Sequence, residues 1–312
     1  MQSREQAIIN GFNFQNPQIL RGDDAAAITL SHPSLIVSQD TLCEGVHFDL
    51  TFCSPEDIAH RVIHANLSDM AAMGLHGEMI LQSLAIPKHL SRDWIKKYTH
   101  SFNTVMEKNH LTLVGGDICR SMNDLMITIT IMDQCPQSSP ITRHGAKPGN
   151  LIAITKPPGH AALGLEALKR KTDHLSHFKA CFLRPSTQNT LAVQLRETGC
   201  VRAMLDSSDG LIDSLNHIIT QSKVGIHLDL DLLPTSSEFI KACNTLQLDP
   251  IQLQLNGGED YGLVMSIDET LLKQCAPNTV FPIGRVTDDK TLQLTHHGKS
   301  YQFDHGGFSH FE

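Results

Sequence analysis

The chain has 312 residues, roughly twice the size of a common ~150-residue domain, which predicts two domains. Hydrophobic residues make up 40% and charged residues 19%, a balance that excludes a chain that is disordered as a whole. Asp and Glu number 33 against 25 Lys and Arg, and this formal charge of −8 argues against binding nucleic acid by neutralising phosphates.

Short apolar runs and longer amphipathic segments alternate in the N-terminal part of the chain. The runs predict strands over 25–30, 35–38, 78–86 and 125–132. The longer segments predict helices over 55–73 and 91–109. Pro55 suits the first turn of the first helix and Gly74 follows its last residue, which supports both ends.

A stretch rich in turn-forming residues, 135–149, follows these elements and predicts a domain boundary, with domains over 1–138 and 139–312. Beyond it, strands are predicted over 151–155, 201–205, 226–230 and 261–267, and helices over 161–171 and 209–222. Leu211, Leu215, Ile218 and Ser222 lie on one face of the last helix. Helices and strands are interleaved in both halves, which predicts a mixed α and β fold.

Targeting and membrane signals are not evident in the sequence. The first residues lack a basic region followed by an apolar stretch, and no run reaches the ~18 apolar residues that span a bilayer. We therefore expect a cytoplasmic protein with neither a membrane nor a nucleic-acid partner. The eight cysteines show no C-x-x-C pair, so a zinc cage is not expected.

Familiar nucleotide and hydrolase signatures are also absent. Gly298-Lys299-Ser300 resembles the end of a P-loop, but Gln293 stands where the leading glycine belongs, so this segment predicts a hairpin turn. No G-x-G-x-x-G, H-E-x-x-H or G-x-S-x-G occurs. A P-loop, a dinucleotide fold, a zincin and a serine hydrolase are therefore disfavoured.

Aspartates recur instead beside small residues where strands are predicted to end. The four clusters are Gly22-Asp23-Asp24, Ser38-Gln39-Asp40, Gly115-Gly116-Asp117 and Asp206-Ser207-Ser208-Asp209. Carboxylates gathered at strand ends are the hard oxygen ligands that magnesium takes, and magnesium would allow an acidic protein to hold a phosphate. Each cluster alone also fits ordinary turn and helix-capping chemistry.

Two further segments carry acidic residues beside small residues. Ala65, Asp69 and Ala72 share one helix face, so a partly buried carboxylate needs a partner there, either a metal ion or a nearby donor. Gly257 and Gly258 precede Glu259, Asp260 and Tyr261. Glycines permit a close approach of the backbone to a ligand, although a plain turn would use the same residues.

In this order the motifs resemble those of the thiamine-monophosphate kinase family. That family belongs to a superfamily with aminoimidazole ribonucleotide synthetase, selenophosphate synthetase and a hydrogenase maturation factor. The matching stretches are Gly22–Ala26, Ser38–Leu42, Glu44–Phe48, Asn66–Gly74, Leu113–Asp117, Arg120-Ser121, Arg143–Gly149, Asp206–Leu211, Gly257–Tyr261 and Ile283–Arg285. They cover the chain from residue 22 to about 285, with a weaker match to 312.

The resemblance implies the two-domain aminoimidazole ribonucleotide synthetase-like fold. Its N-terminal α/β domain would bind ATP and magnesium and dimerise through its sheet, and its C-terminal domain would be α+β. The implied activity is phosphorylation of thiamine monophosphate to thiamine diphosphate, with ATP as co-substrate and several magnesium ions as cofactors. The partners would be these two substrates and a second copy of the chain.

The resemblance also implies roles for residues at matching positions. The implied magnesium ligands are Asp24, Ser38, Gln39, Asp40, Asp69, Asp117, Asp206 and Asp209. The implied ATP contacts are Gly116, Asp117, Arg143 and Ser208, and the implied thiamine-substrate contacts are His47, Glu259 and Phe308. The attacking phosphate of the substrate is already ionised near neutral pH, so direct in-line transfer needs no catalytic base from the protein.

Three positions depart from the family pattern. Gln39 replaces a usual Thr, Ile118-Cys119 replaces Thr-Thr, and Phe308 replaces Tyr or Trp. The first change would move one metal contact to the backbone, and the second removes side-chain hydroxyls that could contact ATP.

Other functions stay open at this stage. An aminoimidazole ribonucleotide synthetase-like enzyme is the first enzymatic alternative, and a metal-dependent phosphatase is another. A magnesium- and ATP-binding regulatory module without turnover is the alternative from another class. Selenophosphate synthetase would need a cysteine in the N-terminal tail, but the first is Cys43, and the hydrogenase factor would need a C-terminal cysteine, whereas the sequence ends Phe311-Glu312.

Overall fold

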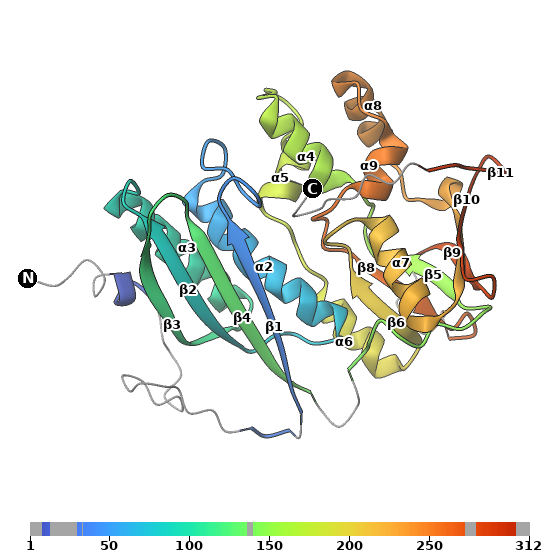
Figure 1. Cartoon of the computed structure of the whole chain (residues 1–312), viewed down its shortest axis with the longest axis horizontal. Helices are drawn as coiled ribbons and strands as arrows, with labels where there is room; N and C mark the ends of the chain where they lie inside the picture. The colour runs from blue at the N-terminus through green and yellow to red at the C-terminus, as the bar shows by residue number, and fades with distance from the viewer. Residues whose placement is uncertain (1–7, 13–29, 33, 136–139, 272–278, 304–312) are drawn as a thin grey trace, which may run out of the picture. The chain divides into compact units, whose positions relative to one another are not determined.

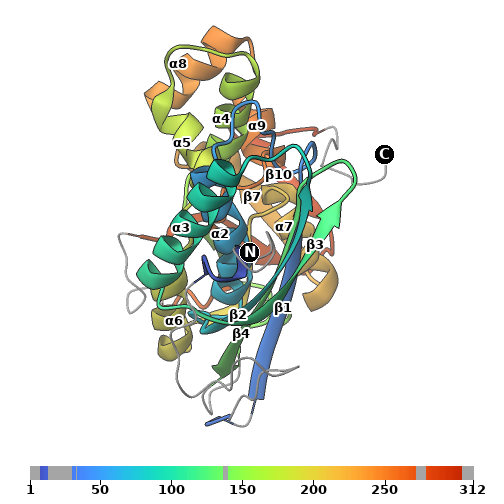
Figure 2. The same cartoon turned by 90° about the vertical axis from the view of Figure 1, so that its left-hand side faces the viewer.

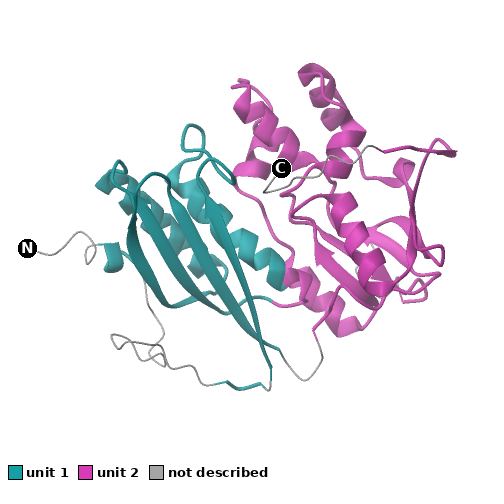
Figure 3. Ribbon diagram, in the orientation of Figure 1, with its two compact units in different colours: residues 1–70, 76–139 teal, residues 71–75, 140–312 magenta. Residues whose placement is uncertain are grey.

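The computed structural model describes residues 8–12, 30–32, 34–135, 140–271 and 279–303 (Figure 1). The chain divides into two compact units, residues 1–70 with 76–139 and residues 71–75 with 140–312 (Figure 3). Both units contain helices and strands, which confirms the mixed α and β class. In the part of the chain that is described, no helix is long and apolar enough to cross a membrane.

The first unit is built on a four-stranded sheet in the order β1-β4-β2-β3. Its elements are β1 (Ser34–Cys43), α2 (Pro55–Ala72), β2 (Met79–Pro87), α3 (Arg92–Lys108), β3 (Thr112–Ser121) and β4 (Met126–Cys135). β4 is antiparallel to β1 and β2, and β2 is parallel to β3. Helices α2 and α3 lie on one face of this sheet (Figures 1 and 2).

The predicted helices of this unit are confirmed within about a residue at each end. Helix α3 begins where the Ser91 hydroxyl accepts a hydrogen bond from the Trp94 backbone N–H at 3.1 Å, which satisfies one of the unpaired N–H groups of the first turn. The predicted strands 78–86 and 125–132 correspond to β2 and β4. The strand predicted over 25–30 lies, apart from Leu30, outside the described residues.

The prediction that Asp40 and Asp117 stand at strand ends is wrong. β1 continues three residues past Asp40 to Cys43, and β3 continues four residues past Asp117 to Ser121. β1 is longer than its apolar run because polar cross-strand pairs extend its ladder with β4. Thr41 and Thr128 share a hydrogen bond of 2.8 Å between their hydroxyls.

The second unit contains a seven-stranded sheet in the order β11-β10-β7-β9-β5-β8-β6. Its strands are β5 (Leu151–Ile154), β6 (Val201–Asp206), β7 (Gly225–Asp229), β8 (Leu263–Ile267), β9 (Phe281–Thr287), β10 (Leu292–His296) and β11 (Lys299–Ser300). Its helices are α4 (His160–Lys169), α5 (Ser176–Leu183), α6 (Asn189–Thr198), α7 (Leu211–Ser222), the 3-10 helix η1 (Leu230–Leu232), α8 (Ser237–Leu246) and α9 (Pro250–Asn256). Only the β10 and β7 pair is parallel among these neighbours.

Strands β5 and β6 of this sheet have buried side chains on both faces. Ile152 and Leu205 belong to one hydrophobic cluster with Leu215 of α7. Their strand neighbours Ala153 and Met204 belong to a separate cluster that includes side chains of α6. Because successive side chains point to opposite faces, both faces need apolar residues, and this explains the continuous apolar runs in the sequence.

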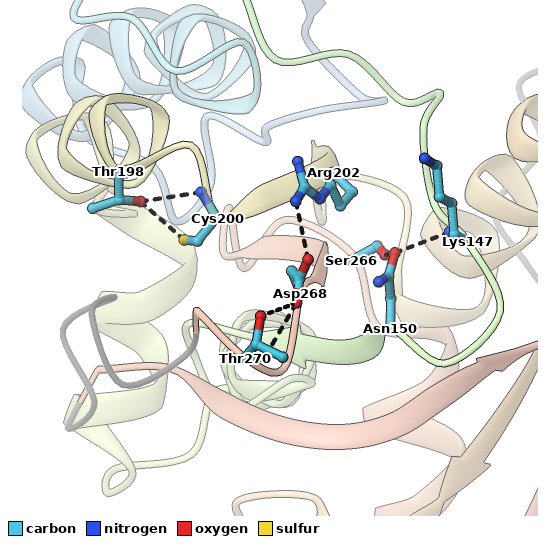
Figure 4. A network of polar contacts seen from close by, with 8 residues as sticks. All are labelled: Lys147, Asn150, Thr198, Cys200, Arg202, Ser266, Asp268 and Thr270. Atoms are coloured by element: carbon cyan, nitrogen blue, oxygen red, sulfur yellow. Dashed lines mark hydrogen bonds and ion pairs between the residues drawn. The ribbon is translucent and has the colours of Figure 1, made fainter.

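Polar contacts fix the ends of these strands (Figure 4). Arg202 of β6 donates to the Asp268 carboxylate at 3.0 Å, just after β8 ends. Asn150, just before β5, accepts hydrogen bonds through Oδ1 from the Lys147 backbone and the Ser266 hydroxyl, at 2.9 and 3.2 Å. The strand ends are therefore held by side-chain hydrogen bonds as well as by the ladder.

A two-residue turn joins β10 to β11. His297 and Gly298 both have positive φ, of 52° and 69°, and His296 pairs with Lys299 across the hairpin. Two consecutive positive φ angles are typical of the tight turns that suit the twist of antiparallel strands. The predicted hairpin turn is confirmed, and the segment is not a P-loop.

Candidate active site

Ser38 and Asp69 meet in the first unit. Ser38 pairs with the fully buried Ile131 of β4, so its side chain lies on the sheet face that the helices cover. There its hydroxyl donates a short hydrogen bond to the carboxylate of Asp69 on α2. The partner expected for the partly buried Asp69 is therefore a hydroxyl of the sheet, and two predicted magnesium ligands are in contact.

Asp40 and Gln39 lie on opposite faces of β1. Asp40 pairs with the buried Ile129, which places it on the same face as Ser38. Gln39 lies on the other face, where its Nε2 donates to the Thr130 hydroxyl at 2.6 Å. The structure therefore brings Asp40 to the face of Ser38 and Asp69, and it directs the side chain of Gln39 away from them.

Gly116 and Asp117 are exposed residues of β3 that follow an irregularity in its pairing with β2. The register shifts between Ile80 and Leu81 of β2. A Cβ atom added at Gly116 would lie 2.1 Å from the Gln82 carbonyl oxygen, so only glycine fits there without a backbone shift. Such bulges are common beside active sites because they redirect nearby side chains.

His47 lies in the loop after β1. Its Nδ1 accepts a hydrogen bond from the Cys43 backbone N–H at 3.1 Å, so the proton of the neutral ring is on Nε2. Arg61, a buried residue of α2, donates through Nη2 to the His47 carbonyl oxygen at 3.0 Å. These contacts fix both the loop and the tautomer of the ring. Asp24 and Phe308 lie outside the described residues.

Two loops of the second unit, 206–210 after β6 and 257–262 before β8, lie side by side. The Glu259 backbone N–H donates to the Ser208 carbonyl oxygen at 2.7 Å, and the Ser207 N–H donates to the Gly262 carbonyl oxygen at 2.8 Å. Asp206 is buried at the end of its strand, and Asp209 is exposed. The structure thus brings together the segments that carry four predicted site residues.

The second loop holds two residues in a backbone conformation that side chains disfavour. Glu259 has a φ of 64° and Tyr261 a φ of 48°. Such left-handed residues cost about 1–3 kcal/mol each and persist only where surrounding contacts impose them. The strain at Glu259, a predicted substrate contact, therefore requires an anchor nearby.

Asp260 provides that anchor. Its buried carboxylate accepts hydrogen bonds from the backbone N–H groups of Gly159 and Ala161, at 2.5 and 2.8 Å, at the start of α4. Burial raises the pKa of Asp260 to about 6, although the two N–H bonds and the nearby Lys156 act in the opposite direction. Lys156 also donates through Nζ to the Asp260 carbonyl oxygen at 2.9 Å.

Sequence reasoning did not assign Asp260 or Lys156 a place in the site. Asp260 appears there only as the neighbour of Glu259, and Lys156 follows a predicted strand without any motif. Their contact joins residues 104 positions apart, and no local periodicity indicates it. One sequence feature could have indicated Asp260: it is an acidic residue between Glu259 and the aromatic Tyr261.

Arg143 lies in the extended segment that follows the joint between the units. The neighbouring Thr142 carbonyl oxygen accepts a hydrogen bond from the Met204 backbone N–H at 3.0 Å, which holds this segment along β6. Gly145 has a φ of 126°, and an added Cβ would lie 2.3 Å from the Arg202 carbonyl oxygen. Arg143 is therefore presented, exposed, from a backbone that packs closely on the strand leading to Asp206.

Comparison with known proteins covers both units. The N-terminal domain of AIR synthase related proteins matches residues 22–132, and the C-terminal domain matches residues 147–297. Thiamine-monophosphate kinase of Buchnera aphidicola subsp. Schizaphis graminum is 35% identical over 306 residues, covering 93% of this chain and 91% of that protein.

Solved structures agree with the sequence relatives. The crystal structure of thiamine-monophosphate kinase from Stenotrophomonas maltophilia K279a is 29% identical, with a TM-score of 0.81 over 95% of this chain and 96% of that one. AaThiL complexed with AMPPCP and TMP is 27% identical, with a TM-score of 0.81 over 93% and 91%. The resemblance inferred from the motifs is confirmed: the chain belongs to the AIR synthase related proteins and, among them, to the thiamine-monophosphate kinase family.

Proposed function

We propose that this chain is the enzyme that transfers a phosphoryl group from ATP to thiamine monophosphate and forms thiamine diphosphate. The observation that carries the proposal is the match, over more than nine-tenths of both chains, to AaThiL bound to AMPPCP and TMP. Curated relatives of 31–35% identity are thiamine-monophosphate kinases, and this chain matches each of them over 91% of its length. These matches support the same activity.

Magnesium fits the oxygen donors that this chain offers. The contact between Ser38 and Asp69, with Asp40 on the same face, supplies hard oxygen ligands and negative charge that calls for a cation. The proposed ligands are Asp24, Ser38, Gln39, Asp40, Asp69, Asp117, Asp206 and Asp209. Bound magnesium ions would neutralise phosphate charge during transfer. Because the side chain of Gln39 bonds to Thr130, its contact would come from the backbone carbonyl.

The remaining proposed contacts divide between the two substrates. Gly116, Asp117, Arg143 and Ser208 would contact ATP, and His47, Glu259 and Phe308 would contact thiamine monophosphate. Gly116 and Asp117 are exposed on β3, and Arg143 offers an exposed guanidinium to a phosphate. The chain would act by positioning, since the attacking phosphate oxygen needs no base near neutral pH.

The direct test is incubation of the purified protein with ATP, magnesium and thiamine monophosphate, followed by chromatographic detection of thiamine diphosphate. We expect one thiamine diphosphate for each ATP consumed. Formylglycinamidine ribonucleotide as the acceptor tests the aminoimidazole ribonucleotide synthetase alternative in the same assay. A protein that binds ATP and magnesium without turnover of either acceptor would instead be a regulatory module.

We also propose a homodimer formed through the first sheet. The face of the sheet opposite α2 and α3 exposes Leu35, Val37 and Met126, by 36%, 53% and 43%. A symmetric partner could bury these apolar side chains. Light scattering should give a dimer mass at micromolar protein, and Val37→Glu should shift it toward the monomer. A monomer mass for the unsubstituted protein would contradict the proposal.

Two further assignments complete the proposal. Domains 1–138 and 139–312 would have separate roles, the first in binding ATP and magnesium and in dimerisation. The protein would act in the cytoplasm, where ATP and magnesium are abundant. Limited proteolysis at the joint and cell fractionation test these two assignments.

A further inference from the structure

Two histidines and a cysteine meet on helices α4 and α5, apart from the residues proposed to bind ATP and thiamine monophosphate. His160 is the first residue of α4, and His177 and Cys181 lie one helical turn apart on α5. One ring nitrogen of each histidine and the Cys181 sulfur all lie within 4.8 Å of one another. The three groups are thus close enough to share one small ligand.

The fold fixes the orientation of this group. Positions i and i+4 of a helix share a face, so His177 and Cys181 point the same way from α5. The His160 ring stacks on Phe239 of α8, with centroids 5.2 Å apart, and lies perpendicular to the Phe178 ring, with centroids 5.1 Å apart. Phe178 and Phe239 are fully buried in the cluster that joins α4, α5 and α8. His177 is exposed, which leaves a path from solvent to the group.

We propose that His160, His177 and Cys181 form a binding site for a divalent transition metal ion of the zinc type. Imidazole nitrogen and thiolate sulfur are the ligands that zinc and cobalt prefer, whereas magnesium takes oxygen. With bonds of about 2.0 Å to nitrogen and 2.3 Å to sulfur, ligand atoms around a tetrahedral ion lie roughly 3.3–3.5 Å apart. Side-chain movements of about 1 Å would therefore close the group onto an ion.

Three protein ligands leave one tetrahedral position for water or another small ligand. Binding exchanges the Cys181 thiol proton for the metal, so one proton is released to solvent for each ion bound. The charges of Asp260 and Lys156 act on Cys181 in opposite directions, and Asp260 has the larger effect. The prediction that no zinc cage occurs rested on C-x-x-C spacing, which does not detect an H-x-x-x-C pair completed by a histidine from another helix.

Cobalt is the probe for this site, because a cobalt–thiolate bond gives a charge-transfer absorption that oxygen ligands do not. The reduced, chelator-treated full-length protein is titrated with Co2+ in the absence of nucleotide. We expect the thiolate band to saturate at one equivalent per chain, and to be lost on adding Zn2+ but not on adding excess Mg2+. Cobalt bound at the proposed magnesium ligands would give no such band, so the result does not depend on the proposed activity.

Matched variants assign the ligands. Cys181→Ser should abolish the thiolate band, and His177→Ala should weaken cobalt binding by roughly tenfold or more. Cys119→Ser removes an exposed thiol elsewhere, and His174→Ala removes an exposed imidazole near α5. Both controls should keep the band and its affinity. His177 is exposed, so its variant keeps the test valid if Cys181→Ser misfolds, as judged by circular dichroism.

The proposal is overturned if the unsubstituted protein develops no thiolate band at several-fold excess cobalt. It is equally overturned if the band persists in Cys181→Ser, or if it disappears in Cys119→Ser. If His177→Ala and His174→Ala lower the affinity for cobalt to the same extent, His177 is also excluded as a specific ligand.

Discussion

The two units hold their candidate site residues in different ways. In the first unit, Ser38, Asp40 and Asp69 project from a regular strand and a regular helix, and strand alternation determines the faces of Ser38 and Asp40. In the second unit, Glu259 lies in a strained loop that the buried Asp260 ties to α4. In the first unit, the candidate site side chains can therefore be changed with little effect on stability. In the second unit, the contacts that position Glu259 also contribute to stability.

The largest expected effect tests the first half of this comparison. Asp40→Asn, Asp69→Asn and Asp117→Asn should each lower turnover by roughly 100- to 1,000-fold, since each removes ligand charge where phosphate charge must be balanced. Unfolding free energies should change little because an amide is nearly isosteric and these residues are half-buried or exposed. Steady-state kinetics, magnesium titration and urea unfolding on the same samples give both quantities.

Ser38→Ala is the control for Asp69→Asn, since it removes the hydrogen bond and keeps the carboxylate charge. Its loss of turnover should be the smaller of the two. Near-normal rates in all three aspartate variants, with unchanged circular dichroism, would refute the magnesium proposal for the first unit. A large loss of stability in them would refute the separation of function from stability.

The next effect tests the second unit through pH. The pKa of Asp260 is raised to about 6 in the folded chain, so this carboxyl contributes most stability below its ordinary pKa, where it is protonated in both states. That contribution should be lost as the pH rises from about 4 to 6, by something on the order of 3 kcal/mol. Asp260→Asn cannot titrate, so the difference between wild-type and variant unfolding free energies should show the slope.

His160 changes stability in the opposite sense over the same interval. Burial, with the nearby His177 and Lys156, lowers the pKa of His160 to about 4, so its contribution increases as the pH rises. Because His160 is present in both proteins, its effect cancels in the difference. Urea unfolding of both proteins at several pH values across this interval measures the difference in their unfolding free energies. If that difference does not change with pH, Asp260 does not couple the loop to stability.

Local sequence patterns predicted several of the helices and strands, but not α5, α6, α8 and α9, and not the contacts between elements. Helix α2 was predicted almost to the residue because Pro55 and Gly74 mark its ends. β1 was predicted too short because the pattern changes from apolar to polar at Ser38, and the continuation depends on Thr128 and Thr130, about 90 residues away. A strand held by distant polar partners gives no signal of its own.

The candidate site was predicted through the family motifs rather than from periodicity. The contact of Ser38 with Asp69 unites two residues that were named separately. Asp260 was left without a role because its partners Gly159 and Ala161 lie about 100 residues earlier in the chain. Sequence motifs identify ligand-type residues, whereas the residues that position them depend on tertiary contacts.

A third prediction asks whether the strained loop serves the thiamine substrate. Glu259→Gln should lower kcat/KM for thiamine monophosphate by roughly 10- to 150-fold, which corresponds to one lost charge-assisted hydrogen bond of ~1.5–3 kcal/mol. The KM for ATP should barely change. Glu197→Gln, at an exposed glutamate of α6, is the matched control and should leave both constants unchanged. An equal loss for ATP and thiamine monophosphate would assign Glu259 to the phosphate-binding residues instead.

The smallest effect concerns the stability of the first unit. It tests whether removing a carboxylate charge costs less unfolding free energy than adding a methyl group to a tightly packed strand. Gly116→Ala should lower the free energy of unfolding by about 1–3 kcal/mol, because its Cβ would lie 2.1 Å from the Gln82 carbonyl oxygen and the backbone must move. Gly115→Ala is the matched control, since its Cβ would meet only the end of the Leu81 side chain, at 3.2 Å, which can rotate away. Its loss should stay below about 1 kcal/mol. Urea unfolding measures the free energy of unfolding of both variants. Equal losses would show that the backbone of β2 and β3 near Asp117 can move to accommodate the added Cβ at Gly116.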